Sequence, residues 1–171
     1  MEKFLEEKYN YIIKNSIYFE EKSELINYLN VCLKENKFLK IKFGIDATFS
    51  SLHLGHYIIL KKLRNLQNQG HEVILLIGDF TAKIGDPTFK NKTRPVLSDK
   101  DINNNYLKYK EQILKILDEK KTIFRFNSEW LKNISFSEII SLFSSCSLNK
   151  ILNRNDFKNR ILKNSHISLH E

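Results

Sequence analysis

At 171 residues the chain has the length of one domain, and a domain of this size buries about two-thirds of the surface of its unfolded chain. Its 28 basic residues exceed its 20 acidic residues, a balance that favours a polyanionic partner unless the excess lysine only solvates the surface. The two cysteines are too far apart in sequence for a disulfide framework or a zinc motif, and no apolar run can span a bilayer, so we expect a cytoplasmic protein with no membrane partner.

The first predicted element is helical. Over residues 2 to 36, apolar side chains recur at helical spacing at Leu25, Leu29, Cys32 and Leu33. Ser23 precedes them and is expected to be the N-cap. These residues therefore form a helical segment in front of the first strand.

A strand, a helix and a second strand are predicted next. Apolar residues alternate with polar ones from Leu39 to Ile45, which is the period of a strand, and a loop follows from Asp46 to Leu52. A helical pattern runs from Leu54 to Gln69, where Gly70 is suited to end it. The apolar run Val73 to Ile77 is typical of a strand buried on both faces of a parallel sheet.

This order predicts an α/β fold with a βαβ unit. Ligands of such sheets bind beyond the carboxyl ends of the strands, where Asp46 to His56 and Gly78 to Arg94 lie. After a polar loop, Ser98 and Asp101 can cap a helix that reaches about Leu117. A shorter third strand is predicted at Thr122 to Phe126, and short helices are predicted from Ser135 onward.

The segment His53-Leu54-Gly55-His56 stands where the loop after the first strand gives way to a helix. Backbone N–H groups, the helix dipole and two imidazoles can together hold a phosphate, so a nucleotide is the expected ligand. A zinc site is disfavoured, because the HExxH motif needs a four-residue spacing and a Glu. A capping histidine with a surface neighbour remains an alternative. All five glycines and both prolines fall between residues 44 and 95, which favours a ligand there.

Two further features follow the second strand. Asp86, in Gly85-Asp86-Pro87, either forms an Asx turn or holds a substrate ammonium. Lys90, Lys92 and Arg94 form either a solvated loop or an electrostatic clamp that closes over the β and γ phosphates.

Seven segments together resemble the bacterial tyrosyl-tRNA synthetases, which are class I aminoacyl-tRNA synthetases. They follow one another in the family's order at residues 42–48, 52–56, 76–81, 84–87, 93–95, 126–131 and 167–171. The similarity is continuous from about residue 39 to the end. The chain departs from the family at Ala47, where Pro is usual, and at Thr88-Phe89, where Ser-Gly is usual.

The resemblance implies the amino-terminal half of a Rossmann-like nucleotide-binding fold. Residues 1–38 would be a helical N-terminal segment, residues 39–134 the first half of the catalytic domain, and residues 135–171 a truncated helical connective region through which these enzymes form homodimers. The region that in the family completes the tyrosine site and the nucleotide-binding fold would lie beyond Glu171.

The resemblance also implies roles for single residues. His53 and His56 would stabilise the transition state for attack of the tyrosine carboxylate on the α-phosphate of ATP, while Lys90 and Arg94 would grip the pyrophosphate. The ATP and adenylate site would also include Gly44, Asp46, Thr48 and Gly55. The tyrosine site would include Lys42, Asp79, Thr81 and Asp86, with Asp86 on the ammonium group.

The implied activity is that of a tyrosine–tRNA ligase, which forms tyrosyl-adenylate and transfers the tyrosyl group to tRNA(Tyr). ATP and Mg²⁺ are implied by the resemblance and not by a metal motif, and no DNA partner is expected. Two alternatives remain: a small adenylyltransferase with the same HxGH turn, and a non-catalytic remnant that binds RNA or dimerises.

Overall fold

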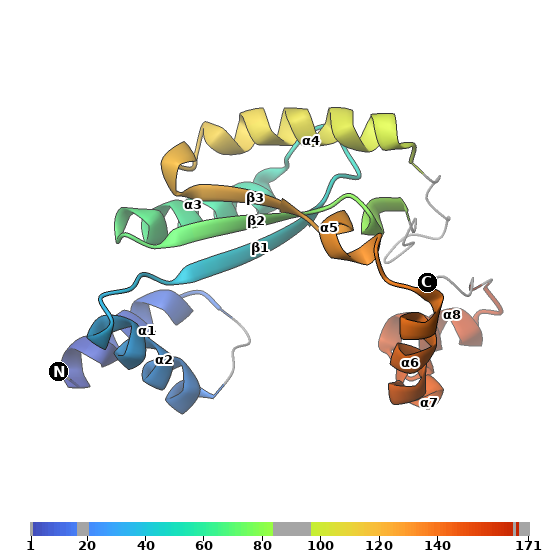
Figure 1. Ribbon diagram of the computed structural model, residues 1–171, viewed down its shortest axis with the longest axis horizontal. Helices are drawn as coiled ribbons and strands as arrows, with labels where there is room; N and C mark the ends of the chain where they lie inside the picture. The colour runs from blue at the N-terminus through green and yellow to red at the C-terminus, as the bar shows by residue number, and fades with distance from the viewer. Residues whose placement is uncertain (1, 17–20, 84–96, 166, 168–171) are drawn as a thin grey trace. The chain divides into compact units, whose positions relative to one another are not determined.

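The computed structural model describes residues 2–16, 21–83, 97–165 and 167 (Figure 1). Two helices, α1 (Glu2–Ile13) and α2 (Lys22–Lys34), precede β1 (Lys40–Asp46), α3 (Leu54–Asn68) and β2 (Glu72–Gly78). The 3-10 turn η1 (Thr81–Lys83) is followed by α4 (Asp99–Leu114), the turn η2 (Glu119–Lys121) and β3 (Thr122–Phe126). The chain continues with α5 (Ser128–Leu131), α6 (Phe136–Ser145), α7 (Leu148–Leu152) and α8 (Asn155–Leu162).

The three strands form one sheet in the order β1-β2-β3, and Figure 1 shows their arrows pointing the same way. A helix connects each strand to the next, as a parallel sheet requires, so the predicted α/β fold is confirmed. Val73, Leu75 and Ile77 are fully buried in β2, whereas Ile74 and Leu76 are only half-buried. The expectation that this strand is buried on both faces therefore holds for one face only.

Contacts group the chain into two compact units. Unit 1 comprises Met1–Phe43, Leu52–Leu75 and Glu111–Phe124, and unit 2 comprises Gly44–Ser51, Leu76–Lys110 and Arg125–Glu171. The domain boundaries that we expect from the sequence, after residues 38 and 134, are a different kind of division from these contact units and stay a prediction. None of the described helices is both long and apolar enough to cross a membrane.

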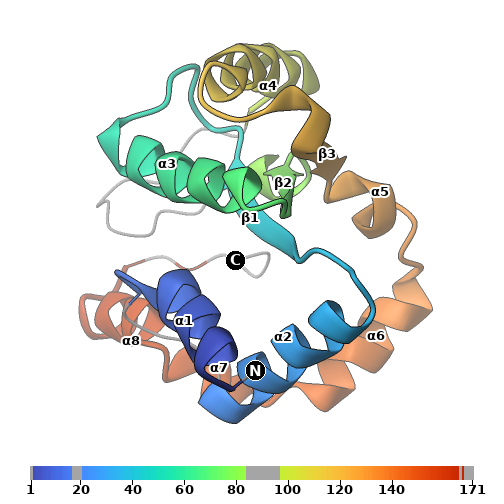
Figure 2. The same ribbon diagram turned by 90° about the vertical axis from the view of Figure 1, so that its left-hand side faces the viewer.

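In unit 1, α1 and α2 lie side by side in both views (Figures 1 and 2). Their apolar faces enclose a core with the residue before β1, formed by Leu5, Tyr9, Leu29, Cys32 and Leu39. The expectation that Ser23 caps α2 is wrong. The helix begins one residue earlier, with Glu21 at the N-cap, and the Ser23 hydroxyl donates to the Glu21 carboxylate at 3.5 Å instead of capping a backbone N–H.

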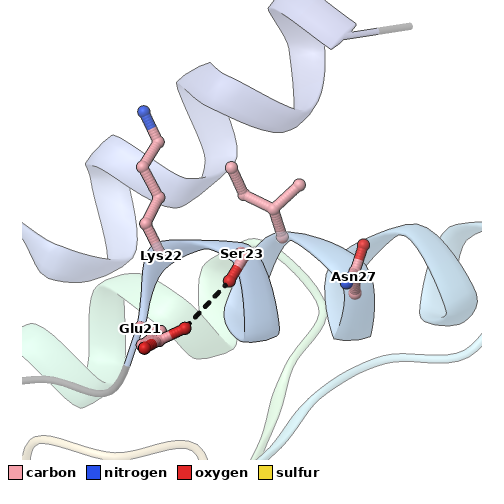
Figure 3. A pocket seen from close by; sticks show the side chains of 5 residues that line it. Glu21, Lys22, Ser23 and Asn27 are labelled. Atoms are coloured by element: carbon pink, nitrogen blue, oxygen red, sulfur yellow. Dashed lines mark hydrogen bonds between the residues drawn. The ribbon is translucent and has the colours of Figure 1, made fainter.

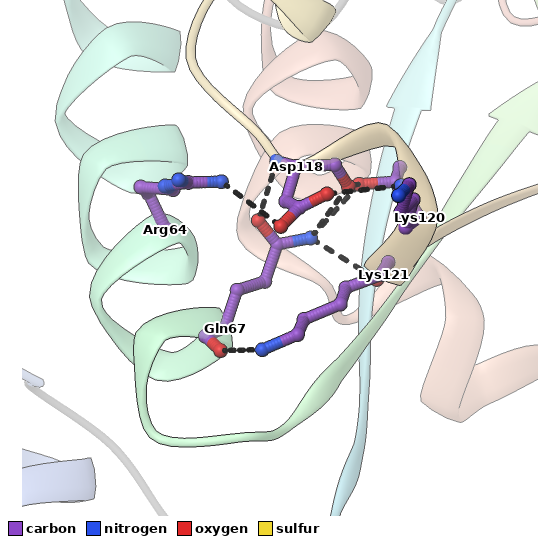
Figure 4. A network of polar contacts seen from close by, with 6 residues as sticks. Arg64, Gln67, Asp118, Lys120 and Lys121 are labelled. Atoms are coloured by element: carbon purple, nitrogen blue, oxygen red, sulfur yellow. Dashed lines mark hydrogen bonds and ion pairs between the residues drawn. The ribbon is translucent and has the colours of Figure 1, made fainter.

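The end of α3 is tied to the turn before β3 by one buried amide, Gln67, which is 1% exposed. Its Nε2 donates to the carbonyls of Asp118 and Lys121 and to the Thr122 hydroxyl, at 3.3, 3.0 and 2.8 Å, and its Oε1 accepts from the Asp118 N–H at 2.9 Å (Figure 4). The Nζ of Lys121 in turn donates a hydrogen bond to the backbone carbonyl of Gln67 at 2.9 Å. Gln67 thus joins two segments about fifty residues apart.

Replacement of Gln67 by Ala is expected to lower the free energy of unfolding by about 1–3 kcal/mol, because the Asp118 N–H loses its buried acceptor. The matched control is Asn68→Ala, since Asn68 is the exposed neighbour on the same helix and its loss is expected to cost less than about 0.5 kcal/mol. Urea unfolding of the 171-residue chain measures both, and equal midpoints for the two variants would contradict this role of Gln67.

In unit 2, Ser98 caps α4 as expected. Its hydroxyl oxygen accepts from the Asp101 N–H at 3.2 Å and donates to the Asp101 carboxylate at 2.6 Å. The helix ends at Leu114, earlier than the expected Leu117. The predicted third strand and the short helices from Ser135 are confirmed, whereas α5 was not predicted.

Candidate functional site: the histidine turn and the strand-end network

The turn that begins α3 is built by its own histidines. His53 is the N-cap, and its Nδ1 accepts a hydrogen bond from the Gly55 N–H at 3.1 Å. His56 reaches back, so that its Nδ1 accepts from the His53 N–H at 3.3 Å. This reciprocal pair is a capping box in which imidazoles take the place of the usual Ser and Glu. The capping role that the sequence left as an alternative is therefore real.

Capping also fixes where the imidazole protons lie. Because Nδ1 is the acceptor in both rings, the neutral form of each ring carries its proton on Nε2, the atom that can donate to a phosphate. The rings stack with their centroids 3.9 Å apart. Partial burial, and then repulsion from His53, lower the pKa of His56 and keep its ring neutral near pH 7. Capping and phosphate binding are thus compatible.

Two neighbours hold this turn in place. A Cβ at Gly55 would lie 3.0 Å from Cε1 and 3.1 Å from Nδ1 of His53, so a larger residue would push the ring away. On the other side, Gln112 of α4 accepts a hydrogen bond from the Leu52 N–H at 3.0 Å. Leu52 directly precedes His53, so Gln112 fixes the entry to the turn. The sequence alone did not single out Gln112.

In unit 2, the ends of β1 and β2 meet in a second polar group. The Thr81 hydroxyl donates to Oδ1 of Asp46 at 2.8 Å. Gly78 lies against this bond, since a Cβ there would stand 1.8 Å from Asp46 Oδ1 and 2.5 Å from Thr81 Oγ1. Only a glycine leaves room for the two side chains to meet.

Asn127, which follows β3, completes this strand-end network and was not predicted as a site residue. It is 7% exposed, its Nδ2 donates to Thr81 Oγ1 at 2.9 Å, and its Oδ1 accepts from the Phe80 N–H at 2.9 Å. Asp79 accepts from the Phe80 and Ser128 N–H groups, both at 3.0 Å. A polar residue directly after a predicted strand is the one sequence signal that could have found Asn127.

The sequence-predicted residues fall into three sets. Unit 1 contains Lys42, His53, Gly55 and His56, and unit 2 contains Gly44, Asp46, Thr48, Asp79 and Thr81. The structure brings the histidines together in one turn, and brings Asp46 and Thr81 together in the strand-end network. Asp86, Lys92, Lys90 and Arg94 lie outside the described residues.

Lys83 and Asp99, which lie in sequence on either side of the segment that contains Asp86, Lys90 and Arg94, form an ion pair in unit 2. Their side chains approach to 2.5 Å. The hydrogen bond from Lys83 lowers the pKa of the Asp99 carboxyl. Within the described residues, no three His, Cys, Asp or Glu side chains gather as metal ligands.

A wide hollow at the start of α2 is a weaker candidate for a nucleotide site. Figure 3 shows Glu21, Lys22, Ser23 and Asn27 around it, and the bond drawn among them joins Ser23 to Glu21. Lys22 is already paired with Glu6 at 2.5 Å. The Ser23 hydroxyl and the Lys22 ammonium are thus already engaged with carboxylates.

The histidine turn and the strand-end network lie within a region that matches a known family model. The model described as tRNA synthetases class I (W and Y) matches residues 34–171. The chain belongs to this family. Family membership supports the synthetase over the small adenylyltransferase that the sequence left open.

Curated members of the synthetase family are similar to the chain over most of its length. The tyrosine–tRNA ligase of Mannheimia succiniciproducens is 52% identical over 139 residues, which are 81% of this chain and 35% of the ligase. Tyrosine–tRNA ligase 2 of Clostridium acetobutylicum is 42% identical over 169 residues, 99% of this chain and 42% of the ligase. The chain thus spans well under half the length of these relatives.

Solved synthetases share the fold. The C-terminally truncated mitochondrial tyrosyl-tRNA synthetase of Coccidioides posadasii superposes with a TM-score of 0.70 at 24% identity, covering 98% of this chain and 47% of that one. The Archaeoglobus fulgidus tyrosyl-tRNA synthetase, solved with L-tyrosine, gives 0.65 at 21% identity, covering 95% and 46%. Together with the parallel sheet, these likenesses confirm the class I Rossmann-like fold.

Proposed function

We propose that this chain is part of a tyrosine–tRNA ligase and supplies residues of the site that activates tyrosine with ATP. The observation that carries the proposal is the histidine capping box at the start of α3, in which Nδ1 of each ring accepts a backbone hydrogen bond and Nε2 of each ring is left to donate. The similarity to curated tyrosine–tRNA ligases favours tyrosine over tryptophan as the amino acid.

In the proposed first step, a carboxylate oxygen of tyrosine attacks the α-phosphate of ATP and pyrophosphate leaves. Negative charge grows on the α-phosphate oxygens in the transition state, and Nε2–H donors of His53 and His56 would stabilise it, together with the helix N-terminus. The neutral state of His56 supports a donor role, because no proton has to be gained or lost during the reaction. Gly44, Asp46, Thr48 and Gly55 are proposed to complete the ATP and adenylate contacts.

Tyrosine is proposed to bind through Lys42, Asp79, Thr81 and Asp86, with the carboxylate of Asp86 on the ammonium group. The strand-end network supports this assignment for Thr81, since Asn127 and Asp46 hold its hydroxyl in one orientation. A fixed hydroxyl loses little conformational freedom when a substrate binds.

Lys90 and Arg94 are proposed to grip the pyrophosphate as it leaves. ATP would enter as its Mg²⁺ complex, and the metal would supply charge neutralisation on the phosphates.

Two further partners are proposed for the ligase, tRNA(Tyr) as the tyrosyl acceptor and a second copy of the protein. Large apolar side chains on α6 and on the helices after it are exposed to solvent, and this exposure supports the proposed dimer. Phe136, Phe143, Leu148 and Leu162 are each between 65% and 77% exposed. Exposed apolar surface of this kind marks an interaction site.

Isotope exchange between pyrophosphate and ATP tests the proposal in the protein that contains this chain. Exchange is expected to depend on tyrosine and to be absent with tryptophan or phenylalanine, because adenylate formation needs the correct amino acid. Exchange driven by tryptophan would overturn the choice of amino acid. Turnover of ATP only with an acceptor that is not an amino acid would overturn the synthetase and support an adenylyltransferase.

A further inference from the structure

A small cavity in unit 1 lies apart from every residue assigned to the reaction. Its volume is about 100 Å³, and it is lined by residues of α1 and α2, of the segment between α2 and β1, and of the segment after α3, among them Lys8, Cys32, Gln69 and His71. A single water needs about 10–15 Å³ of such space, so the cavity has room for several waters or for one small polyatomic ion.

One of the residues that line this cavity, His71, has a buried polar atom without a hydrogen-bond partner in the described part of the chain. The residue is 6% exposed, and its Nδ1 accepts a hydrogen bond from the Leu39 N–H at 3.3 Å. The neutral ring therefore carries its proton on Nε2. Nε2 is buried and has no hydrogen-bond partner in the described part of the chain. Because buried donors are almost always paired in native proteins, a ligand that accepts a hydrogen bond is expected here.

The charges around the cavity select the kind of acceptor. The Lys8 ammonium donates to the Gln69 Oε1 at 3.4 Å and lies 5.6 Å from the centroid of the Phe4 ring, and within the described residues it forms no ion pair. Lys37 also lines the cavity but is neutralised by Glu35, 2.7 Å away. None of the described lining residues is acidic. Burial, and then the Lys8 charge, lower the pKa of His71.

We propose that this cavity binds a small oxyanion, of the phosphate or carboxylate class, held between the Nε2–H of His71 and the ammonium of Lys8. One oxyanion satisfies the buried donor and offsets the Lys8 charge, which a water molecule does not. The cavity is too small for a nucleotide, and the proposal is independent of the ligase activity.

NMR titration of the His71 imidazole in the 171-residue chain tests the proposal, with inorganic phosphate or acetate added at constant ionic strength. Each anion that binds is expected to raise the pKa of His71 in a saturable manner, because it favours the charged ring. Lys8→Met is expected to weaken binding about tenfold or more, as the loss of a hydrogen bond to a charged group does. Lys3→Met, which removes an exposed charge from the same helix, is the control and is expected to leave binding unchanged.

His71→Asn gives a second measurement, since its Oδ1 can still accept from the Leu39 N–H while the Nε2–H is lost. Phosphate is expected to shift the Leu39 amide resonance of the unchanged chain and not that of this variant. A response to phosphate alone or to acetate alone identifies the class of oxyanion. The proposal is overturned if neither anion shifts the pKa beyond the effect of chloride, or if Lys8→Met and Lys3→Met weaken the response equally.

Discussion

Replacement of His53 or His56 by Ala in the complete ligase is expected to lower tyrosine-dependent exchange of pyrophosphate into ATP by one to three decades. The estimate comes from single oxyanion donors, whose removal costs about 10²–10³ in rate. Since both histidines are proposed to act in the transition state, kcat is expected to fall while KM for ATP changes little. Unchanged exchange in both variants would remove the catalytic role that we assign to them.

The capping box complicates this experiment, because Ala also removes a helix cap, and such a loss costs about 0.5–2 kcal/mol of stability. His53→Asn is the matched variant, since Asn is among the best N-cap residues and has no Nε2–H. His56→Gln likewise places at N3 a residue type that capping boxes use. Both are expected to unfold near the midpoint of the unchanged protein and still to lose exchange. Recovery of full activity in the capped variants would show that the histidines act only as caps.

Gly78→Ala is expected to lower the same exchange by about 10²-fold. The new Cβ would lie 1.8 Å from Asp46 Oδ1, so the carboxylate has to move and its 2.8 Å bond with Thr81 has to break. Displacement of a site residue by about 1 Å can cost 10²-fold in rate. Because the Asp46 side chain is short and can swing aside, the loss of stability is expected to be that of one hydrogen bond, about 1 kcal/mol.

Gly44→Ala is the matched control for stability. It also adds one methyl group to a strand glycine of unit 2, but nothing lies within 4 Å of its Cβ position. Comparing the thermal unfolding midpoints of the two variants separates the effect of the close contact between the new Cβ and Asp46 from the general effect of replacing a glycine. If both variants unfold at the same temperature, Gly78 does not serve the contact between Asp46 and Thr81.

The sequence predicted the elements that carry the site because their signals are local. The alternation before Ile45, the helical spacing after His53 and the apolar run around Leu75 each lie within about fifteen residues, and the structure has a strand, a helix and a strand at these places. The histidine cap is local as well, since its two bonds join residues two and three positions apart. Short motifs also sufficed to indicate the synthetase family.

The supports of the site could not be predicted in this way. Gln112 binds Leu52 across 60 positions of sequence, Asn127 binds Thr81 across 46, and Gln67 binds Thr122 across 55. Each is a polar residue that looks like an ordinary surface residue in the sequence, and only the path of the chain shows that it bonds to a distant segment. The misplaced cap at Ser23 has a different, local cause, because α2 begins at Lys22 and the Ser23 hydroxyl bonds to the Glu21 carboxylate two residues away.

The sequence by itself therefore determined the family, the order of the elements and the histidine pair, since periodicity and short motifs depend on near neighbours. The tertiary structure decided how the histidines are held, why Gly78 has no side chain, and that His71 has a buried donor beside a cavity. These features depend on distances between segments far apart in the chain. Folding sets those distances through burial and hydrogen-bond geometry, which no local pattern of residues specifies.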